Sequence, residues 1–545
     1  MRGPEQADIR PSTLQVREIL LSQLPDLTHL PKTSAYRAEL CHYWSLAIRQ
    51  QRPAAIVQPT TTDQVAQIVR ILNQFPDTPF AIKSGGHDPN VGDASTHGGI
   101  LVSLRMMKGV DAYDPETKLA KIRPGGCWND VIGDQKLESH GRTVVGGRLG
   151  AVGVGGYLMQ GGISFLTWQY GMGADNIVAW ETVMPDGSVI VVTPETHPEL
   201  AVAMRGGGNQ FGIVTAFTVR TYPIGKVWGG VRFYSKSQGE RIQNAVLRFT
   251  LEGAKEEPRA AVIPAETYFF RGFGNYSIVF FYDGETPPTT GSFGELLQIP
   301  CFFDWTGVSD YSALLKKLGY GCHYKGRMSF ATATVPALPH ILPEISTKWR
   351  SILQPHFMRT RHALSFWAMT MQPFPSTIGA HTEDRGGNAM GLRASDPDRL
   401  ILEFSGMWQC KSEDETMRKM SLEIIKWLDE KTPGWVAEAR RLREKDGDGD
   451  DASEADWHMP LFMNDAMDGQ DVTKTGTASA TSTRTCLPLG IYRSGCVVTQ
   501  FTFRPTSILP KKRSMLPPIL AYDGTGAWMS HRTRPSLVEG PKPAG

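Results

Sequence analysis

The chain has 545 residues, of which 41% are hydrophobic and 21% charged, and its formal net charge is +2. This chain is longer than one hydrophobic core usually accommodates, so we expect a globular protein of two or three domains. The small net charge gives no electrostatic reason to expect a nucleic-acid partner, and no segment is long and apolar enough to predict a transmembrane helix.

The N-terminus and the cysteines bear on location. Residues 1–8 lack the apolar core of a signal peptide. The seven cysteines are odd in number and scattered, without a CxxC pair, which favours a reduced compartment over a disulfide framework. We therefore expect a cytoplasmic enzyme with no membrane partner and no metal site.

Short strands and helices alternate over the first part of the chain. Residues 1–49 are predicted to be a helical lead-in, and the stretch Thr60–Asp63 offers an N-cap for a helix whose apolar residues share one face. A Pro-Asp-Gly turn at 185–187 indicates a hairpin. The strands that we expect here lie at residues 54–57, 79–83, 100–104, 119–123, 177–180 and on both sides of the turn within 183–192. This pattern predicts an α/β or α+β domain.

The strand at 79–83 leads into Ser84-Gly85-Gly86-His87. Consecutive glycines allow positive φ and let the backbone approach a flat ligand closely, and the imidazole is a nucleophile near neutral pH. Taken alone, the tetrapeptide fits a glycine turn with a surface histidine better. Ten further glycines between residues 146 and 173 would leave backbone amides free to hold phosphate oxygens. A dinucleotide is therefore the natural candidate ligand.

A nicotinamide site of the Rossmann type is one alternative. Gly155 lies twenty residues before Asp175, which superficially suits an acidic ribose ligand. However, the order Gly150-x-x-Gly153-x-Gly155 inverts the GxGxxG pattern, and Asp175 precedes a strand instead of ending it. The spacing disfavours this alternative.

Several motifs follow one another over about residues 50–225: SGGH at 84–87, PGGxW at 124–128, VGVGG at 152–156 and RGGGNxFGIVT at 205–215. As a set they resemble the FAD-binding domain of the vanillyl-alcohol-oxidase/PCMH superfamily. More closely, they resemble the berberine-bridge-enzyme-like oxidases, in particular the fungal FAD-linked oxidoreductases of secondary metabolism.

The resemblance implies an α+β fold with a two-subdomain PCMH-type FAD-binding domain over residues 50–225. A substrate domain with an antiparallel sheet backed by helices would follow over residues 226–455. In it we expect strands at 227–234, 267–273, 276–282 and 400–408 and helices at 241–251, 339–353 and 415–428. Residues 456–472 would return to the FAD domain. Residues 473–545 depart from the family pattern and are expected to be a poorly ordered tail.

In that family, the histidine at the position of His87 bonds covalently to the 8α-methyl group of the flavin, which implies covalent FAD here. Bicovalent members carry a cysteine where this chain has Leu149, and Cys127 fits a small buried cysteine better, so we expect a single link. Val152 stands at the family's gate position, where a small side chain admits dioxygen. The residues predicted to bind FAD are Lys83, Ser84, Gly85, Gly86, His87, Asp88, Gly147, Leu149, Val152, Gly153, Gly155, Gly156, Gly162, Asp175, Gly212, Ile213 and Val214.

The resemblance further implies an oxidase that oxidises a C–OH or C–N centre of a small secondary metabolite by hydride transfer to the flavin, with dioxygen as acceptor. Two alternatives stay open: an oxidative cyclase or pericyclase, and a flavoprotein inactivated by its atypical C-terminus. Such an oxidation usually needs a base. Tyr268, Tyr282 and Glu403 are the candidates, although core packing explains the tyrosines as well. Gln372 and Asn388, in segments that resemble the fungal subgroup's substrate-side motifs, are candidates to bind substrate, or are loop-stabilising amides. The oligomeric state stays open.

Overall fold

The computed structural model describes residues 9–133, 135–269, 272–319, 326–357, 365–445, 457 and 459–470. The chain divides into two units, Met1–Phe501 and Thr502–Gly545, and every described residue belongs to the first. The tail predicted at residues 473–545 lies outside the described residues. In the described part of the chain, no helix is both long and apolar enough to cross a membrane.

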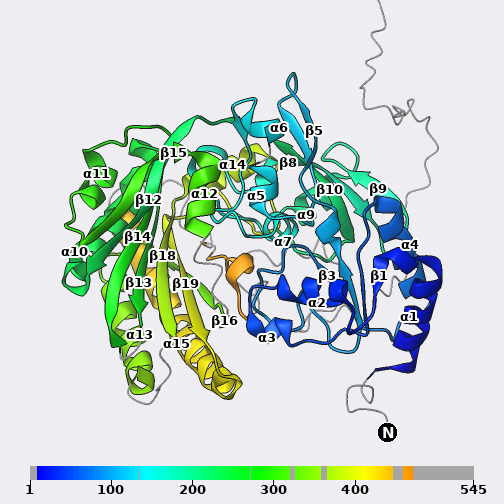
Figure 1. Ribbon diagram of the computed structural model, residues 1–545. Helices are drawn as coiled ribbons and strands as arrows, with labels where there is room; N and C mark the ends of the chain where they lie inside the picture. Colours follow the sequence, from blue (N-terminus) through cyan, green and yellow to red (C-terminus); the bar gives the residue numbers. More distant parts are fainter. Residues whose placement is uncertain are drawn as a thin grey trace, which may run out of the picture. The chain divides into compact units, whose positions relative to one another are not determined.

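A four-stranded sheet in the order β1-β2-β4-β3 forms the first layer (Figure 1). Strands β2, β4 and β3 are parallel, so their carboxyl ends point the same way. Thr61 and Gln64 close a capping box at the start of α4, which is why this helix begins where the sequence predicts. The elements of this part are α1 (Pro11–Gln23), β1 (Thr28–His29), α2 (Ser34–Cys41), α3 (Leu46–Arg49), β2 (Ala55–Val57), α4 (Thr62–Asn73), β3 (Phe80–Lys83) and β4 (Ile100–Ser103).

A five-stranded antiparallel sheet follows, in the order β5-β6-β10-β8-β9. The turn between β8 and β9 contains Gly187 at φ +78°, a backbone conformation that favours glycine. The strands of this part are β5 (Val110–Asp114), β6 (Leu119–Ile122), β8 (Ile177–Val183), β9 (Val189–Val192) and β10 (Ile213–Arg220), with the short pair β7 (Arg142–Thr143) and β11 (Tyr222–Pro223). Its helices are α5 (Trp128–Val131), α6 (Gln135–Glu138), α7 (Val154–Met159), α8 (Thr167–Tyr170) and α9 (Pro198–Met204).

The third sheet is antiparallel and runs β15-β12-β14-β13-β18-β19-β16, with β17 paired to β19. Its strands are β12 (Lys226–Ser235), β13 (Ala260–Tyr268), β14 (Gly274–Tyr282), β15 (Phe303–Asp310), β16 (Arg327–Ser329), β17 (Thr332–Pro336), β18 (Phe366–Phe374) and β19 (Arg399–Trp408). Its helices are α10 (Gly239–Glu256), α11 (Gly291–Leu297), α12 (Tyr311–Gly319), α13 (Ile341–Phe357), α14 (Thr377–Asp384) and α15 (Asp414–Lys445).

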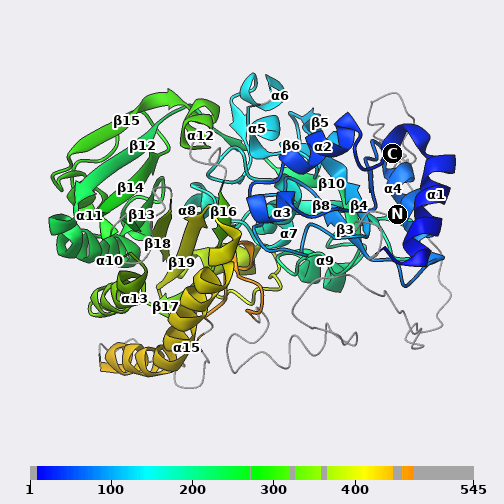
Figure 2. The same cartoon turned by 60° about the horizontal axis from the view of Figure 1, so that its bottom comes forward.

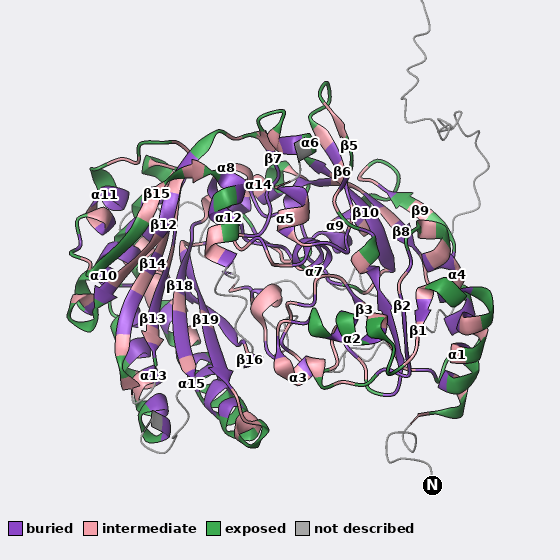
Figure 3. Cartoon of the chain, viewed as in Figure 1, coloured by how far each residue is buried: buried purple, intermediate pink, exposed green. Residues whose placement is uncertain are grey.

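Helices α10, α13 and α15 cover one face of this sheet (Figures 1 and 2), and the strands beneath them are largely buried (Figure 3). The predicted α+β class, with an antiparallel sheet backed by helices, is confirmed. One predicted strand is wrong: the chain is not extended over 267–273, because β13 ends at Tyr268 and the hairpin turns back through Gly272 at φ +72°.

Candidate active site

A cavity of about 570 Å³ lies where the glycine-rich loops of the first two sheets meet strands of the third. Its volume falls in the range of small-molecule and cofactor sites. Most of the residues predicted to bind FAD lie in its wall. They are Ser84, Gly85, Gly86, His87, Asp88, Gly147, Leu149, Val152, Gly153, Gly155, Gly156, Gly212, Ile213 and Val214.

The glycines allow two loops to touch through their backbones. A Cβ atom on Gly85 would lie 2.4 Å from the Cα of Gly153, so neither position tolerates a side chain. Ser84 joins the loops, because its hydroxyl donates to the carbonyl of Pro124 at 2.5 Å and accepts from the amide of Gly155 at 3.1 Å. The result is a bare backbone surface that fits a flat, phosphate-bearing cofactor.

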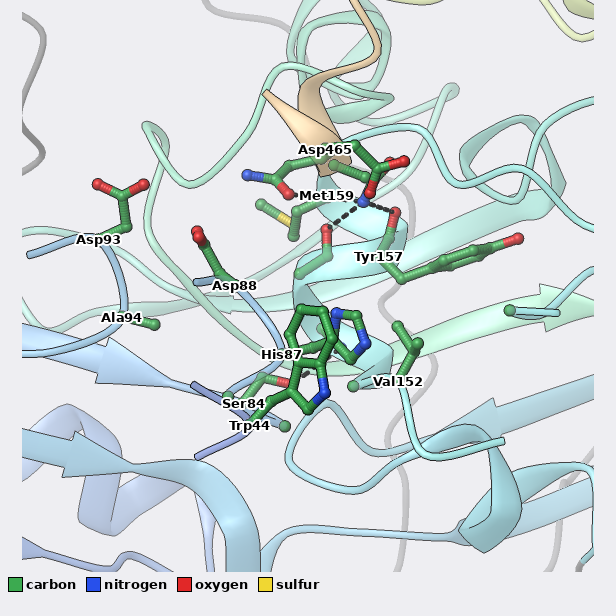
Figure 4. Close-up of a pocket in the computed structure, with 18 of the residues that line it drawn as sticks. Trp44, Ser84, His87, Asp88, Asp93, Ala94, Val152, Tyr157, Met159 and Asp465 are labelled. Atoms are coloured by element: carbon green, nitrogen blue, oxygen red, sulfur yellow. Dashed lines mark hydrogen bonds between the residues drawn. The ribbon is translucent and has the colours of Figure 1, made fainter. Parts of the chain in front are cut away.

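His87 stands at the end of this surface, directly after β3 and the turn at Gly86, which has φ +74°. Its ring lies against the indole of Trp44, with centroids 4.3 Å apart and planes 11° apart (Figure 4). The Nε2 atom is buried and has no hydrogen-bond partner in the described part of the chain. Burial lowers the pKa of His87 to about 4, so at neutral pH the ring is uncharged and retains a nucleophilic lone pair.

Two carboxyl groups follow His87 in the cavity wall. The backbone amide of Asn90 donates to Asp88 Oδ1 at 2.8 Å. Burial, with the nearby charge of Asp93, raises the pKa of Asp88 to about 8, and burial also raises the pKa of Asp93. At neutral pH the pair therefore holds a proton that isolated aspartates would have lost.

Glu403 faces the cavity from the third sheet. Residues of β19 alternate between the sheet's two faces, so Glu403, Ser405 and Met407 reach the cavity while Phe404 packs against Trp349 of α13. The hydroxyl of Thr370 donates to Glu403 Oε2 at 3.4 Å. Burial raises the pKa of the Glu403 carboxyl, against a smaller lowering by the charge of Arg148.

Arg148 is the one lysine or arginine among the described residues of the cavity wall. Its Nη2 donates to Gln372 Oε1 at 2.5 Å. Gln372 therefore contacts a residue of the cavity wall but is not itself part of the wall. Asp465, from the short 3-10 turn Met463–Asp465, lies in the same wall. Burial first, and then the charge of Glu403, raises the pKa of Asp465 well above its ordinary value.

Asp465 is held in place by its neighbour. The amide oxygen of Asn464 accepts from the backbone N–H of Gly162 at 3.0 Å, so Gly162 anchors the C-terminal segment and does not itself line the cavity. Residues 459–470 thus run beside the glycine loops.

Two other predicted FAD-binding residues lie behind the wall. Lys83 forms a buried ion pair with Glu39, Nζ to Oε1 at 2.8 Å. Asp175 accepts hydrogen bonds from Thr382 at 2.8 Å and from the amide of Asn388 at 3.0 Å. Asn388 therefore contacts a buried carboxylate, and neither it nor Asp175 is part of the cavity wall.

The two tyrosines proposed as bases lie away from the cavity. The Tyr268 hydroxyl donates to Glu266 in the core beneath α13, where Ser346 donates to the same carboxylate. The Tyr282 hydroxyl donates to Glu257 at 3.2 Å. Of the three candidates, the structure brings Glu403 alone to the cavity.

Sequence reasoning missed many residues of the wall, and four of them bear on the chemistry of the site: Trp44, Arg148, Phe330 and Asp465. Arg148 had a usable signal, since it is a lone cation in the apolar, glycine-rich stretch 144–156. The other three come from segments without a local pattern and reach the site only through the fold.

Comparison with known proteins agrees with this geometry. Residues 53–193 match the family described as FAD binding domain. The chain is 32% identical over 397 residues to an uncharacterized FAD-linked oxidoreductase of Arthroderma benhamiae. The matched region covers 71% of this chain and 76% of that protein. The chain belongs to the family of FAD-linked oxidoreductases.

Other members of this family carry more specific names. The FAD-dependent monooxygenase tpcD of Cochliobolus heterostrophus is 27% identical over 73% of this chain and 77% of its own length. The bifunctional solanapyrone synthase of Alternaria solani is 28% identical over 78% of this chain and 76% of its own length. Among solved structures, berberine bridge enzyme from Eschscholzia californica matches with a TM-score of 0.58 at 14% identity, over 78% of this chain and 84% of that one. The last likeness shows the fold. This chain is an FAD-dependent oxidoreductase.

Proposed function

We propose that this FAD-dependent oxidoreductase is an oxidase that carries its flavin on His87 and oxidises a C–OH or C–N centre of a small, largely apolar metabolite. The observation that carries the proposal is the position of His87, whose ring stands in the cavity wall and is uncharged at neutral pH. The bare backbone at Gly85 and Gly153 supports flavin binding beside it.

Bound FAD would supply the acceptor for a hydride equivalent and pass the electrons on to dioxygen. The chain's own residues would bind and orient the substrate. The third sheet and residues 459–470 contribute the apolar side chains of Met328, Phe330, Phe366 and Phe462 to the cavity that Glu403 also lines. Such a wall favours an apolar or aromatic metabolite.

Glu403 is our proposed base. It is the predicted candidate that reaches the cavity, and its raised pKa makes the ionised carboxylate a stronger proton acceptor than an exposed glutamate. Arg148 beside it favours the ionised carboxylate, so the two side chains together would set the pH at which the substrate proton is removed.

Acid denaturation tests the flavin link. Purified protein is precipitated with acid, and the washed pellet is examined by absorbance. We expect yellow colour in the wild type and a colourless pellet from His87→Ala. A colourless wild-type pellet would overturn the covalent link.

The acceptor and the product separate the alternatives. An oxidase releases hydrogen peroxide in proportion to substrate consumed, whereas a monooxygenase, as several relatives are named, places an atom of labelled dioxygen in the product. The Alternaria relative is named a bifunctional synthase, so the oxidative cyclase that the sequence left open stays a second candidate, which analysis of the product skeleton would reveal. Lack of both turnover and peroxide with a broad panel of metabolites would support an inactive flavoprotein.

A further inference from the structure

Trp44 belongs to the segment before the FAD binding domain match, which begins at residue 53, yet it lies on His87 itself. The two rings are nearly parallel, with centroids 4.3 Å apart (Figure 4). Phe330, which follows β16 of the third sheet, adds a third ring, 5.2 Å from Trp44 and 6.1 Å from His87. An imidazole is thus held in an aromatic stack contributed by three distant parts of the chain.

The backbone around Trp44 is fixed on both sides. The Trp44 amide donates to the carbonyl of Gly86 at 3.0 Å, so the segment is tied to the turn that presents His87. The next residue, Ser45, accepts from the amide of Met328 at 3.3 Å, and the Leu46 amide donates to the carbonyl of Gly326 at 2.9 Å. These bonds fix the backbone from which the indole projects onto His87.

Within the part of the chain that the structure describes, the ring contacts of Trp44 and, at a larger distance, Phe330 are what orient the imidazole plane. Among the described residues, the His87 ring makes no hydrogen bond, and its Nε2 is buried without a partner. A histidine that acts as a nucleophile usually has its second nitrogen held by an acceptor, which fixes the ring. Here the flat face of Trp44 is the contact that restricts rotation about the last side-chain bond.

We propose that Trp44 is a positioning residue for flavin attachment, holding the His87 ring so that its reactive nitrogen faces the cavity. This rests on the proposed covalent link. In that link, the N–H bond of the imidazole and one C–H bond of the flavin 8α-methyl group break, and an N–C bond forms. The two electrons and two protons released pass through the flavin to dioxygen, the acceptor of the proposed function, giving hydrogen peroxide.

The test follows the rate of attachment when FAD is added to flavin-free protein, read as the fraction of flavin that stays with the acid-precipitated pellet. Trp44→Leu removes the flat ring and should slow attachment about tenfold, with the rate expressed per flavin bound before acid treatment. Trp44→Phe keeps a flat ring and should restore most of the rate. Trp305→Leu, which removes an exposed tryptophan on β15, should match the wild type.

The two proposals fail in different ways. A wild-type protein that never retains flavin after acid overturns the covalent link itself. Retention by the wild type with equal rates in Trp44→Leu overturns the role of Trp44, and so does a Trp44→Phe rate as low as that of Trp44→Leu. If Trp44→Leu does not fold, Trp44→Met takes its place: a rate equal to that of Trp44→Phe refutes positioning by a flat ring.

Discussion

Asp88 makes the stability of this protein depend on pH in a direction opposite to that of most aspartates. Burial and the nearby Asp93 raise its pKa from 3.8 to about 8. Between these pH values the folded protein keeps the proton that the unfolded chain releases, so stability falls as pH rises from about 4 to about 8 and then levels off. Asp88→Asn removes this penalty and keeps the oxygen that accepts from the Asn90 amide.

The size of the effect follows from the pKa. A change from 3.8 to about 8 corresponds to about 6 kcal/mol for a carboxyl shut off from water. Because Asp88 is partly buried at the wall of a cavity, water screens it, and we expect about 2–3 kcal/mol at pH 8.5. Near pH 4.5 the variant and the wild type should differ little.

The assay is denaturant unfolding of the flavin-loaded protein at pH 4.5 and pH 8.5, with the free energy of unfolding compared between wild type and Asp88→Asn. Asp310→Asn, at the exposed end of the edge strand β15, is the matched control and should change stability by only a few tenths of a kcal/mol at either pH. An Asp88→Asn effect of the same size at both pH values would show that Asp88 does not have a raised pKa in the folded protein.

Three further predictions concern the cavity wall. In flavin-free protein, Gly85→Ala would press a methyl group against Gly153 and should lower the free energy of unfolding by about 1–3 kcal/mol. A methyl group at Gly156 would have no atom within 4 Å, so flavin-free Gly156→Ala should have the stability of the flavin-free wild type. Equal effects of the two substitutions would contradict the loop contact. Because the pKa of Glu403 is raised, its carboxyl ionises only as pH rises, and kcat/KM of the wild type should increase with pH. Glu403→Gln should abolish this pH dependence and lower kcat/KM about 10²–10⁴-fold. An unchanged pH profile in Glu403→Gln would exclude Glu403 as the base. Val152→Ile adds a methylene to the wall and should slow reoxidation of the flavin by dioxygen in stopped-flow absorbance, and an unchanged rate would argue against a gate there.

The sequence predicted best what local backbone chemistry decides. The helix after Thr61, the strand Phe80–Lys83 and the hairpin around Gly187 lie where capping, periodicity and turn residues put them. The glycine loops were also found from sequence, because a backbone surface without side chains can be built only from glycine.

Side chains that reach the cavity from distant segments were not predictable in this way. Trp44 and Asp465 lie more than 400 residues apart in the sequence, and only the fold brings both to the wall. Tyr282 shows a different limit: an alternating strand indicates which residues share a face, but not which face meets the cavity. Here Phe280 and Tyr282 face the helices.

The length of the predicted strand at 267–273 failed for a related reason. Aromatic and β-branched residues favour extended backbone on both sides of a tight turn. The sequence pattern therefore did not show where the strand ends and the hairpin turns. Gly272, at φ +72°, marks the turn in the structure.

The proposed flavin link on His87 can be located directly by mass spectrometry. Tryptic digestion of the holoenzyme should yield the peptide 84–105, which contains both His87 and His97, and mass spectrometry with fragmentation locates any added FAD on one of them. We expect a peptide heavier by one FAD, with the added mass on His87. An unmodified peptide from a flavin-loaded sample, or FAD on His97, would contradict the proposed link.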